Sequence, residues 1–132
     1  MAKEIPIGAS GIAEESVKFE HTLTARHAEL PPVYSTPDMI RLMETAAFHA
    51  LQSYCDPGEI TVGTAINIEH RAASNIGAHI KAEAILESFD GKFFVLRVTA
   101  HDGANEIGRG TVTRSVVNVS RFLEKMKAKP QR

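Results

Sequence analysis

Three side chains in the first half of the chain have the types that enzymes use for acid–base and nucleophilic chemistry: Thr36, Glu44 and His70. Glu44 falls on the shoulder of an apolar helix face, where an ionised carboxylate is costly to bury unless it is paired. The imidazole of His70 donates or accepts a proton near neutral pH. The Thr36 hydroxyl stands at a helix start, where free backbone amides attract a carboxylate or an oxyanion. These three residues are therefore our candidate catalytic residues.

Each of the three also has a plain structural interpretation, which the residues alone leave open. Glu44, at the border of the helix face, is compatible with a side chain that bends out to solvent. His70 is compatible with an ordinary core or interface histidine. Thr36 is compatible with a residue that caps a helix and does nothing more.

Two further residues are candidates for contact with a ligand. Gly63 interrupts a strand that otherwise favours β structure, so it either permits a bulge or lets a ligand approach the backbone, the bulge being favoured. Arg114 shares the parity of Val112 and Val116 in the last expected strand. It is either an anion contact or an ion-pair partner, and the sequence does not separate these two roles.

The clearest helix signal surrounds Glu44. Thr36 is expected as the N-cap, Pro37 suits the first helical position, and no Gly or Pro follows until Asp56-Pro57-Gly58 stops the helix. At about 100° per residue the apolar side chains fall on one broad arc. This arc comprises Met39, Ile40, Leu42, Met43, Ala46, Ala47, Ala50, Leu51 and Tyr54. A helix with so wide an apolar arc is expected to be wrapped by other elements.

Alternating or apolar segments predict the wrapping strands. A first strand is expected over Ser16–Ala25, and four more follow the helix, over Thr61–Ala72, Ala78–Glu87, Lys92–His101 and Glu106–Val119. Turn signals at Asp90-Gly91 and Asp102-Gly103, with short links throughout, predict an antiparallel meander of these four. Counting by two from the start of the second strand gives its inward set: Val62, Thr64, Ile66, Ile68 and His70.

This order of elements predicts an α+β fold with one long helix buried by a curved antiparallel sheet of about five strands. Residues 1–16 are small and polar and are expected to form a flexible lead-in, with a single domain over residues 17–132. Open sheet edges in so small a chain favour pairing with a second copy, so we expect a homodimer, with higher oligomers left open.

Composition excludes several classes of function. The chain has 132 residues and a formal net charge of -1, which disfavours general binding to nucleic acid or to an anionic membrane. The basic tail from Arg121 to Arg132 is expected to be a solvated end. There is no apolar run of membrane-spanning length and no signal-peptide core, and Cys55 is the only cysteine, so a cytoplasmic protein is expected. No spacing typical of a metal site or of a nucleotide-binding motif occurs.

Three segments together resemble a known family. They read TPDMIRLMETAA over Thr36–Ala47, CDPGEITVGTAINIEHRAA over Cys55–Ala73 and VTAHDGANEIGRGTVTRSVV over Val98–Val117. This combination resembles the hotdog-fold thioesterases, and among them it looks most like the fluoroacetyl-CoA thioesterase group. The similarity covers roughly residues 18 to 127, with the helix carboxylate, the strand histidine and the AHDG run in the expected order.

The resemblance implies a hotdog fold that acts as a dimer with active sites at the subunit interface, and hydrolysis of an acyl-CoA thioester without metal or cofactor. The catalytic residues of the group fall on Thr36, Glu44 and His70, its active-site glycine on Gly63 and its strand arginine on Arg114. The fluoroacetyl-specific enzyme has a longer, Phe-containing lid before the helix. Here Ala25–Ser35 reads ARHAELPPVYS, so Val33 and Tyr34 are the bulky side chains available to contact the acyl group.

Two other functions remain open at this stage. One is a hotdog hydratase or dehydratase acting on enoyl or 3-hydroxyacyl thioesters, which also uses a histidine and a carboxylate. The other is a non-catalytic protein that binds acyl-CoA or another small apolar ligand. Release of free thiol from an acyl-CoA would distinguish hydrolysis from both of them.

Overall fold

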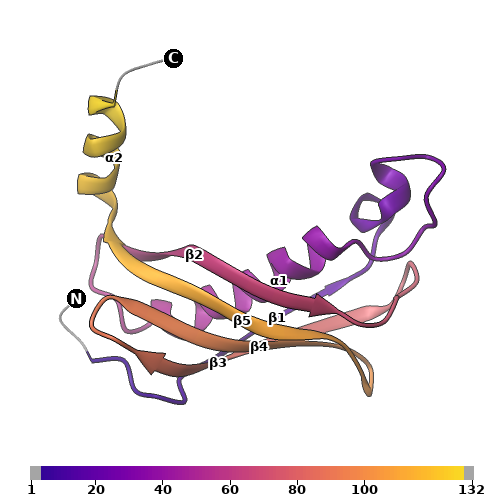
Figure 1. The fold of residues 1–132 in the computed structure, drawn as a ribbon, viewed down its shortest axis with the longest axis horizontal. Coiled ribbons are helices and arrows are strands. Elements are labelled where there is room, and N and C mark those ends of the chain that lie inside the picture. The colour runs from indigo at the N-terminus through magenta and orange to yellow at the C-terminus, as the bar shows by residue number, and fades with distance from the viewer. Residues whose placement is uncertain (1–3, 130–132) are drawn as a thin grey trace.

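One long helix lies against one face of a curved five-stranded antiparallel sheet in the computed structural model, which describes residues 4–129 (Figure 1). The helices are α1 (Thr36–Gln52) and α2 (Val119–Ala128), with two short 3₁₀ turns, η1 (Phe19–His21) and η2 (Leu23–Ala25). The strands are β1 (Ser10–Ser16), β2 (Glu59–His70), β3 (His79–Phe89), β4 (Phe93–Asp102) and β5 (Asn105–Asn118). This arrangement confirms the expected α+β fold.

Helix α1 begins one residue earlier than the expected cap implies. Ser35 is the N-cap, because its hydroxyl accepts a hydrogen bond from the backbone amide of Asp38 at 3.1 Å. The expectation that Thr36 caps the helix is therefore wrong; Thr36 is the first helical residue, and its hydroxyl is free for another contact. The apolar arc is buried as expected, and its fully buried members are Met39, Leu42, Met43, Ala46, Ala47, Ala50 and Leu51.

The strand order is β1-β3-β4-β5-β2. The meander expectation holds for β3, β4 and β5, which follow one another through the turns at residues 90–92 and 103–104. It is wrong for β2, which pairs with β5 rather than β3, because residues 71–78 carry the chain across the end of the sheet. Among residues 4–129, no strand pairs with the outer edge of β2, so β2 forms one side of the sheet.

The N-terminal segment differs most from expectation. The strand expected over Ser16–Ala25 is wrong, because β1 covers Ser10–Ser16 and pairs with β3, while residues 19–25 form η1 and η2. A Cβ atom at Gly11 would clash with the backbone of Ala46, so the small residue permits close packing of β1 on α1. Residues 10–16 of the expected lead-in therefore form a strand that packs on α1. Residues 1–3 of that lead-in lie outside the described residues.

A β-bulge in β2 changes which of its residues face α1. The register against β5 shifts between Gly63 and Ala65. Thr61 is buried on the helix side before the bulge, whereas Ile66 and His70 face that side after it. The inward set expected by counting from the strand start is therefore correct only beyond the bulge, because an extra residue reverses the parity.

The C-terminal helix α2 was not expected from the sequence, which suggested only a solvated basic end. The side chain of Asn118 caps it by accepting from the Arg121 amide at 3.0 Å. Helix α2 projects away from the sheet (Figure 1), and its apolar residues Phe122, Leu123 and Met126 are exposed. In the described part of the chain, neither α1 nor α2 has the length and apolarity needed to cross a bilayer.

Candidate active site

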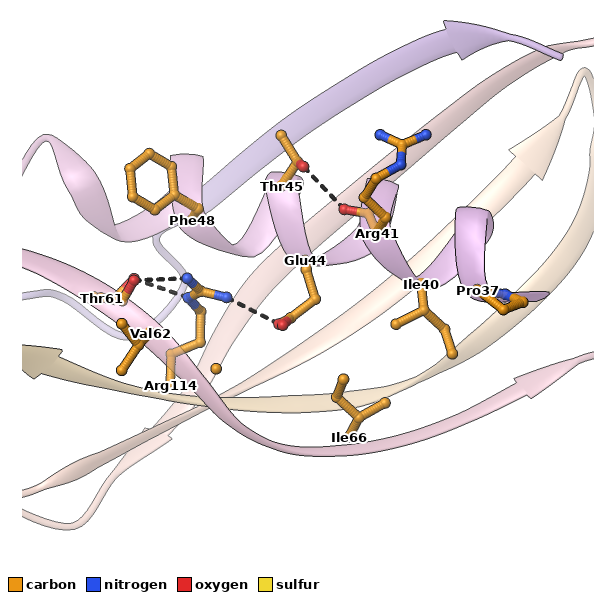
Figure 2. A pocket seen from close by; sticks show the side chains of 11 residues that line it. Pro37, Ile40, Arg41, Glu44, Thr45, Phe48, Thr61, Val62, Ile66 and Arg114 are labelled. Carbon is orange, nitrogen blue, oxygen red and sulfur yellow. Dashed lines mark hydrogen bonds and ion pairs between the residues drawn. The ribbon is translucent and has the colours of Figure 1, made fainter. Parts of the chain in front are cut away.

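Glu44 points from α1 toward the sheet and meets Arg114 of β5 (Figure 2). The guanidinium Nη1 donates to Glu44 Oε1 at 2.9 Å. Its Nε donates to the Thr61 hydroxyl at 2.8 Å, and its Nη2 donates to the Thr61 backbone oxygen at 2.7 Å. Arg114 is only 6% exposed, so this ion pair is shielded from water on the arginine side. Of the two roles left open for Arg114, the structure shows the ion-pair partner.

Gly63 lies directly beneath the Glu44 carboxylate. A Cβ atom at position 63 would lie 2.5 Å from Glu44 Oε2, closer than any real side chain tolerates. The β-bulge expected at Gly63 is confirmed, and the missing side chain also lets the carboxylate approach the backbone. The Glu44 side chain is 26% exposed, so a water molecule or a substrate can reach it.

The exposed side of Glu44 opens into a cavity of about 600 Å³ between α1 and β2. Its other walls are largely apolar and include Ile40, Phe48 and Ile66 (Figure 2). A mostly apolar cleft with a few convergent polar groups is typical of sites for small molecules. The alternative in which Glu44 bends out to bulk solvent is therefore not what the structure shows.

Thr36 and His70 meet at the other end of β2. Thr36 Oγ1 lies 2.8 Å from His70 Nδ1, although 34 residues separate them in sequence. The contact exists because Ser35 caps α1 and leaves the Thr36 hydroxyl available. Burial lowers the pKa of His70 from its ordinary 6.5, and an interaction with the Ala72 backbone opposes that shift. His70 Nε2 is buried and meets no hydrogen-bond partner among residues 4–129.

The Thr36–His70 pair lines a second cavity of about 260 Å³, together with Leu23, Val33 and Tyr34. Val33 is half-buried at its edge. Tyr34 is 1% exposed, and its hydroxyl donates to Glu15 Oε2 at 2.6 Å. Tyr34 thus forms a fixed wall of the cavity, whereas Val33 offers a more accessible surface.

The candidate residues therefore fall into two groups within one chain. Glu44, Gly63 and Arg114 share the first cavity, and Thr36 and His70 share the second. Gly63 and His70 stand seven residues apart on β2, or about 20 Å at the usual rise of a strand. Within residues 4–129 of one chain, Glu44 contacts Arg114 and His70 contacts Thr36, and the two residues line different cavities.

Sequence patterns missed Thr61 and Glu15. Thr61 provides two acceptors for Arg114, but the bulge hides its inward parity. Glu15 lay in the segment expected to be flexible, and only the position of β1 beside α1 brings it to Tyr34 and Arg41. An acidic residue in a segment of small residues carries no periodic signal of burial.

The sequence and the fold of this chain both match known proteins. Residues 17–120 match the sequence profile of the family described as fluoroacetyl-CoA-specific thioesterase. The chain is 38% identical over 115 residues to the fluoroacetyl-CoA thioesterase of Streptantibioticus cattleyicolor. The aligned region covers 87% of this chain and 83% of that protein. A solved structure of the fluoroacetyl-CoA thioesterase FlK superposes with a TM-score of 0.88 at 34% identity, covering 97% of this chain and 99% of that one.

More distant structures share the fold. A thioesterase-superfamily member from Thermus thermophilus has a TM-score of 0.83 at 25% identity and covers 98% of this chain and 100% of its own. A hot-dog-like protein from Thermanaerovibrio acidaminovorans has a TM-score of 0.85 at 20% identity, covering 96% of each chain, which shows the fold alone. The expected hotdog fold is therefore confirmed. The chain belongs to the family of fluoroacetyl-CoA-specific thioesterases, and at the level of that family the acyl-CoA thioesterase activity expected from its motifs is confirmed.

Proposed function

We propose that the protein hydrolyses the CoA thioester of a small acyl group with Thr36, Glu44 and His70 as its catalytic residues. The observation that carries the proposal is the Glu44 carboxylate, held by Arg114 against Gly63 and open to a cavity of about 600 Å³. The relatives support the choice of substrate, since one solved FlK structure contains fluoroacetate and CoA. The single cysteine fits a reducing compartment, so the proposal includes a cytoplasmic location.

The catalytic site is completed by a second copy of the chain. Strand β2 has an unpaired edge, and residues 63–67 along it are exposed. An unpaired edge strand is a ready template for pairing with an identical strand. Antiparallel pairing of two β2 strands about a two-fold axis exchanges their ends, so the His70 end of one meets the Glu59 end of the other.

The strand register supports this composite site. With an axis near the middle of the exposed run and the extra residue of the bulge left unpaired, the partner's His70 comes close to the first residues of β2, on the same face as Thr61. Thr61 receives the two hydrogen bonds that fix Arg114 beside Glu44. The Thr36–His70 pair of one protomer thus approaches the Glu44–Arg114 pair of its partner. The homodimer has two equivalent sites, each with residues from both protomers.

The geometry defines the roles of the three residues. Glu44 acts on the thioester carbonyl, either by taking a proton from a water that attacks it or by attacking it directly. In the second route, the carboxylate oxygen forms an anhydride as the thiolate leaves, and water then splits the anhydride. His70 gives a proton to the departing thiolate or orients the attacking group, and Thr36 holds the imidazole in place.

Gly63, Arg114, Val33 and Tyr34 shape the site around the substrate. Gly63 and Arg114 fix the carboxylate at the carbonyl, and Val33 and Tyr34 line the cavity on the histidine side. Ala25–Ser35 has no Phe, so the acyl group meets Val33 in its place. Hydrolysis is measured by release of free CoA, detected with a thiol reagent, over acyl-CoAs from acetyl upward. The panel includes fluoroacetyl-CoA. It also includes an enoyl-CoA, for which loss of the conjugated double bond without release of thiol would indicate a hydratase.

Mixing two inactive variants tests the composite site. Glu44→Gln and His70→Ala are each expected to lower kcat by at least about 10²-fold with the fold intact. Mixed dimers of the two variants contain one site with both native residues, so refolding them together restores about a quarter of the wild-type rate. A mixture that stays inactive, from variants that still dimerise, contradicts a site shared between protomers. Near wild-type turnover in both variants contradicts the catalytic assignment itself.

A further inference from the structure

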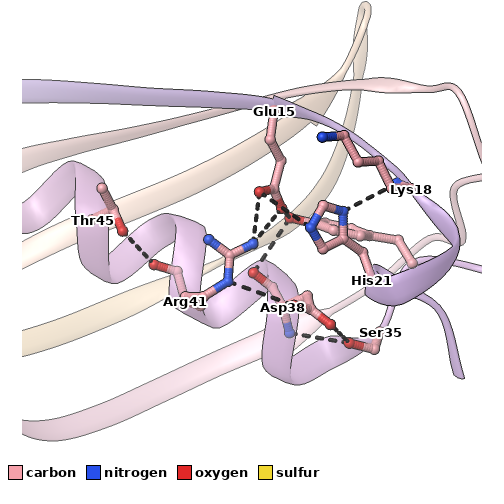
Figure 3. A network of polar contacts seen from close by, with 8 residues as sticks. Glu15, Lys18, His21, Ser35, Asp38, Arg41 and Thr45 are labelled. Carbon is pink, nitrogen blue, oxygen red and sulfur yellow. Dashed lines mark hydrogen bonds and ion pairs between the residues drawn. The ribbon is translucent and has the colours of Figure 1, made fainter. Parts of the chain in front are cut away.

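A second charged cluster, centred on Glu15, lies beside the candidate site, and Tyr34 is the member that also lines a cavity described above. The carboxylate of Glu15, on β1, accepts a hydrogen bond from Arg41 Nη2 at 2.6 Å (Figure 3). It also accepts one from the Tyr34 hydroxyl at 2.6 Å. His21 Nε2 lies 3.9 Å from the same carboxylate. The Glu15 side chain is 16% exposed, so its charge is largely removed from water. Its partners come from η1, from the segment before α1 and from α1 itself.

This cluster holds the residues on both sides of Thr36. Tyr34 precedes it by two positions, and its hydroxyl also lies 3.3 Å from the Asp38 backbone oxygen in the first turn of α1. Arg41 Nε lies 3.5 Å from Asp38, whose carboxylate accepts from the Ser35 hydroxyl at 2.6 Å. The start of α1 is therefore tied to β1 through a single carboxylate.

The same segment is also tied to the chain that leaves His70. The Tyr34 amide donates to the Ser74 backbone oxygen at 2.9 Å. Tyr34 thus stands between Glu15 on one side and the residues that follow β2 on the other. A displacement of the Tyr34 ring would move Thr36 relative to His70, because the two segments meet at this residue.

Packing alone does not explain a charged residue at position 15. Burial of an ion pair is weak evidence for stability, since well-packed apolar side chains often replace such a pair at no cost. A carboxylate does supply what an apolar residue lacks, namely fixed directions for the Tyr34 hydroxyl and the Arg41 guanidinium. The neighbouring Glu14 provides a contrast: it faces the other side of β1, is half exposed and pairs with His79 at 2.7 Å.

We propose that Glu15 is a positioning residue for thioester hydrolysis, which sets the Thr36 hydroxyl on the His70 imidazole through Tyr34 and Arg41. The inference rests on the catalytic roles proposed for Thr36 and His70. Glu15 does not touch the substrate, so its loss lowers the rate of the chemical step more than it weakens substrate binding.

Steady-state kinetics of matched variants tests this role. Glu15→Gln keeps the size of the side chain and removes its charge, and Tyr34→Phe keeps the ring and removes the donor. Each is expected to lower kcat roughly 10- to 100-fold while KM changes less than about threefold. Glu14→Gln, the control on the same strand, leaves both constants at wild-type values. Wild-type kcat in folded Glu15→Gln and Tyr34→Phe, or an equal loss in Glu14→Gln, overturns the proposal.

A double-mutant cycle separates positioning from a general loss of stability. In a Thr36→Val background, which already lacks the hydroxyl, Glu15→Gln is expected to lower kcat by no more than about twofold, because the two residues act through one contact. A further loss as large as that seen in the wild-type background shows independent action and overturns the proposal. Should Glu15→Gln fail to fold, the same cycle is run with Tyr34→Phe.

An NMR titration of the His70 ring distinguishes failure of this inference from failure of the proposed function, since it needs no turnover. Glu15→Gln is expected to move the His70 titration toward that of Thr36→Val, and Glu14→Gln to leave it unchanged. If Thr36→Val keeps full activity but Glu15→Gln still changes the His70 ring in this way, the catalytic role of Thr36 is wrong and the structural coupling stands. A His70 titration unaffected by Glu15→Gln overturns the coupling.

Discussion

The Thr36 hydroxyl lies 2.8 Å from Nδ1 of His70, which places the first residue of the long helix against the last residue of the edge strand. This contact depends on Ser35, which caps the helix one residue earlier. If Thr36 were the cap, its oxygen would accept a backbone amide of the first turn and would not be available to the imidazole. The Thr36 hydroxyl is therefore available to His70, because Ser35 makes the capping hydrogen bond of the helix.

Thr36→Val is expected to lower kcat roughly 10- to 100-fold, because it keeps the β-branched shape but removes the contact with His70. Thr36→Ser keeps the hydroxyl and is expected to remain within about threefold of wild type. Thermal unfolding of both variants checks that Ser35 still caps α1. Equal turnover of the two variants would show that the hydroxyl has no role in the reaction.

Gly63→Ala is expected to displace the Glu44 carboxylate, since the new Cβ would lie 2.5 Å from Oε2. Because the clashing atoms are the end of a flexible, partly exposed side chain that can shift toward the cavity, we expect destabilisation of only about 1 kcal/mol and a fall in kcat of about 10²-fold. In a Glu44→Ala background the same substitution should cost much less stability, because the clashing atoms are gone. Denaturant unfolding of the wild type, the two single variants and the double variant measures this coupling. If Gly63→Ala lowers the free energy of unfolding equally in both backgrounds, a clash with Glu44 is not the cause.

Arg114→Met is expected to destabilise the fold by about 3 kcal/mol, because it leaves Glu44 and two Thr61 acceptors without their donor in a largely buried place. Arg97→Met is the matched control. Arg97 lies on β4, is 56% exposed and pairs with Glu87 at 3.4 Å, so its loss should cost about 1 kcal/mol or less. Urea unfolding compares the two; similar losses would mean that burial of the Glu44–Arg114 pair has little effect.

The low pKa of His70 predicts a specific pH dependence. Burial disfavours the imidazolium, so the folded chain binds this proton only below the ordinary value of 6.5, whereas the unfolded chain binds it near 6.5. Between the lowered pKa of the folded state and 6.5, the unfolded state carries more protons than the folded state. The contribution of His70 to the stability of the fold is therefore complete above pH 6.5 and is lost as the pH falls through the folded pKa.

Two measurements check this sign. Thermal unfolding between about pH 7.5 and about pH 5 should show a loss of stability in the wild type that is smaller in His70→Ala. Where His70 orients the attacking group as a neutral imidazole, its lowered pKa should appear as an acid limb of kcat/KM below pH 6.5. Where it gives a proton to the thiolate, the same pKa should appear as an alkaline limb below pH 6.5. Either limb above that value would show that His70 is not shielded from water in the active protein.

Local patterns in the sequence were sufficient to predict the long helix and the strands after it. The apolar arc of α1, the turn signals and the alternation of β3 all report on neighbouring residues, and these elements formed where expected. The candidate residues Glu44 and His70 also followed from local patterns. Each is a polar side chain on an otherwise apolar face, which is a visible departure from the period of a helix or a strand.

Other features required the tertiary structure. The choice of Ser35 over Thr36 as the cap, the reversal of parity at the β2 bulge and the packing of Gly11 on α1 each depend on a neighbour far away in sequence. The pairing of Thr36 with His70 and of Glu44 with Arg114 has the same origin. Periodicity describes the face on which a side chain lies, but a hydrogen bond between distant segments is set by how the elements pack, and only the folded chain fixes that packing.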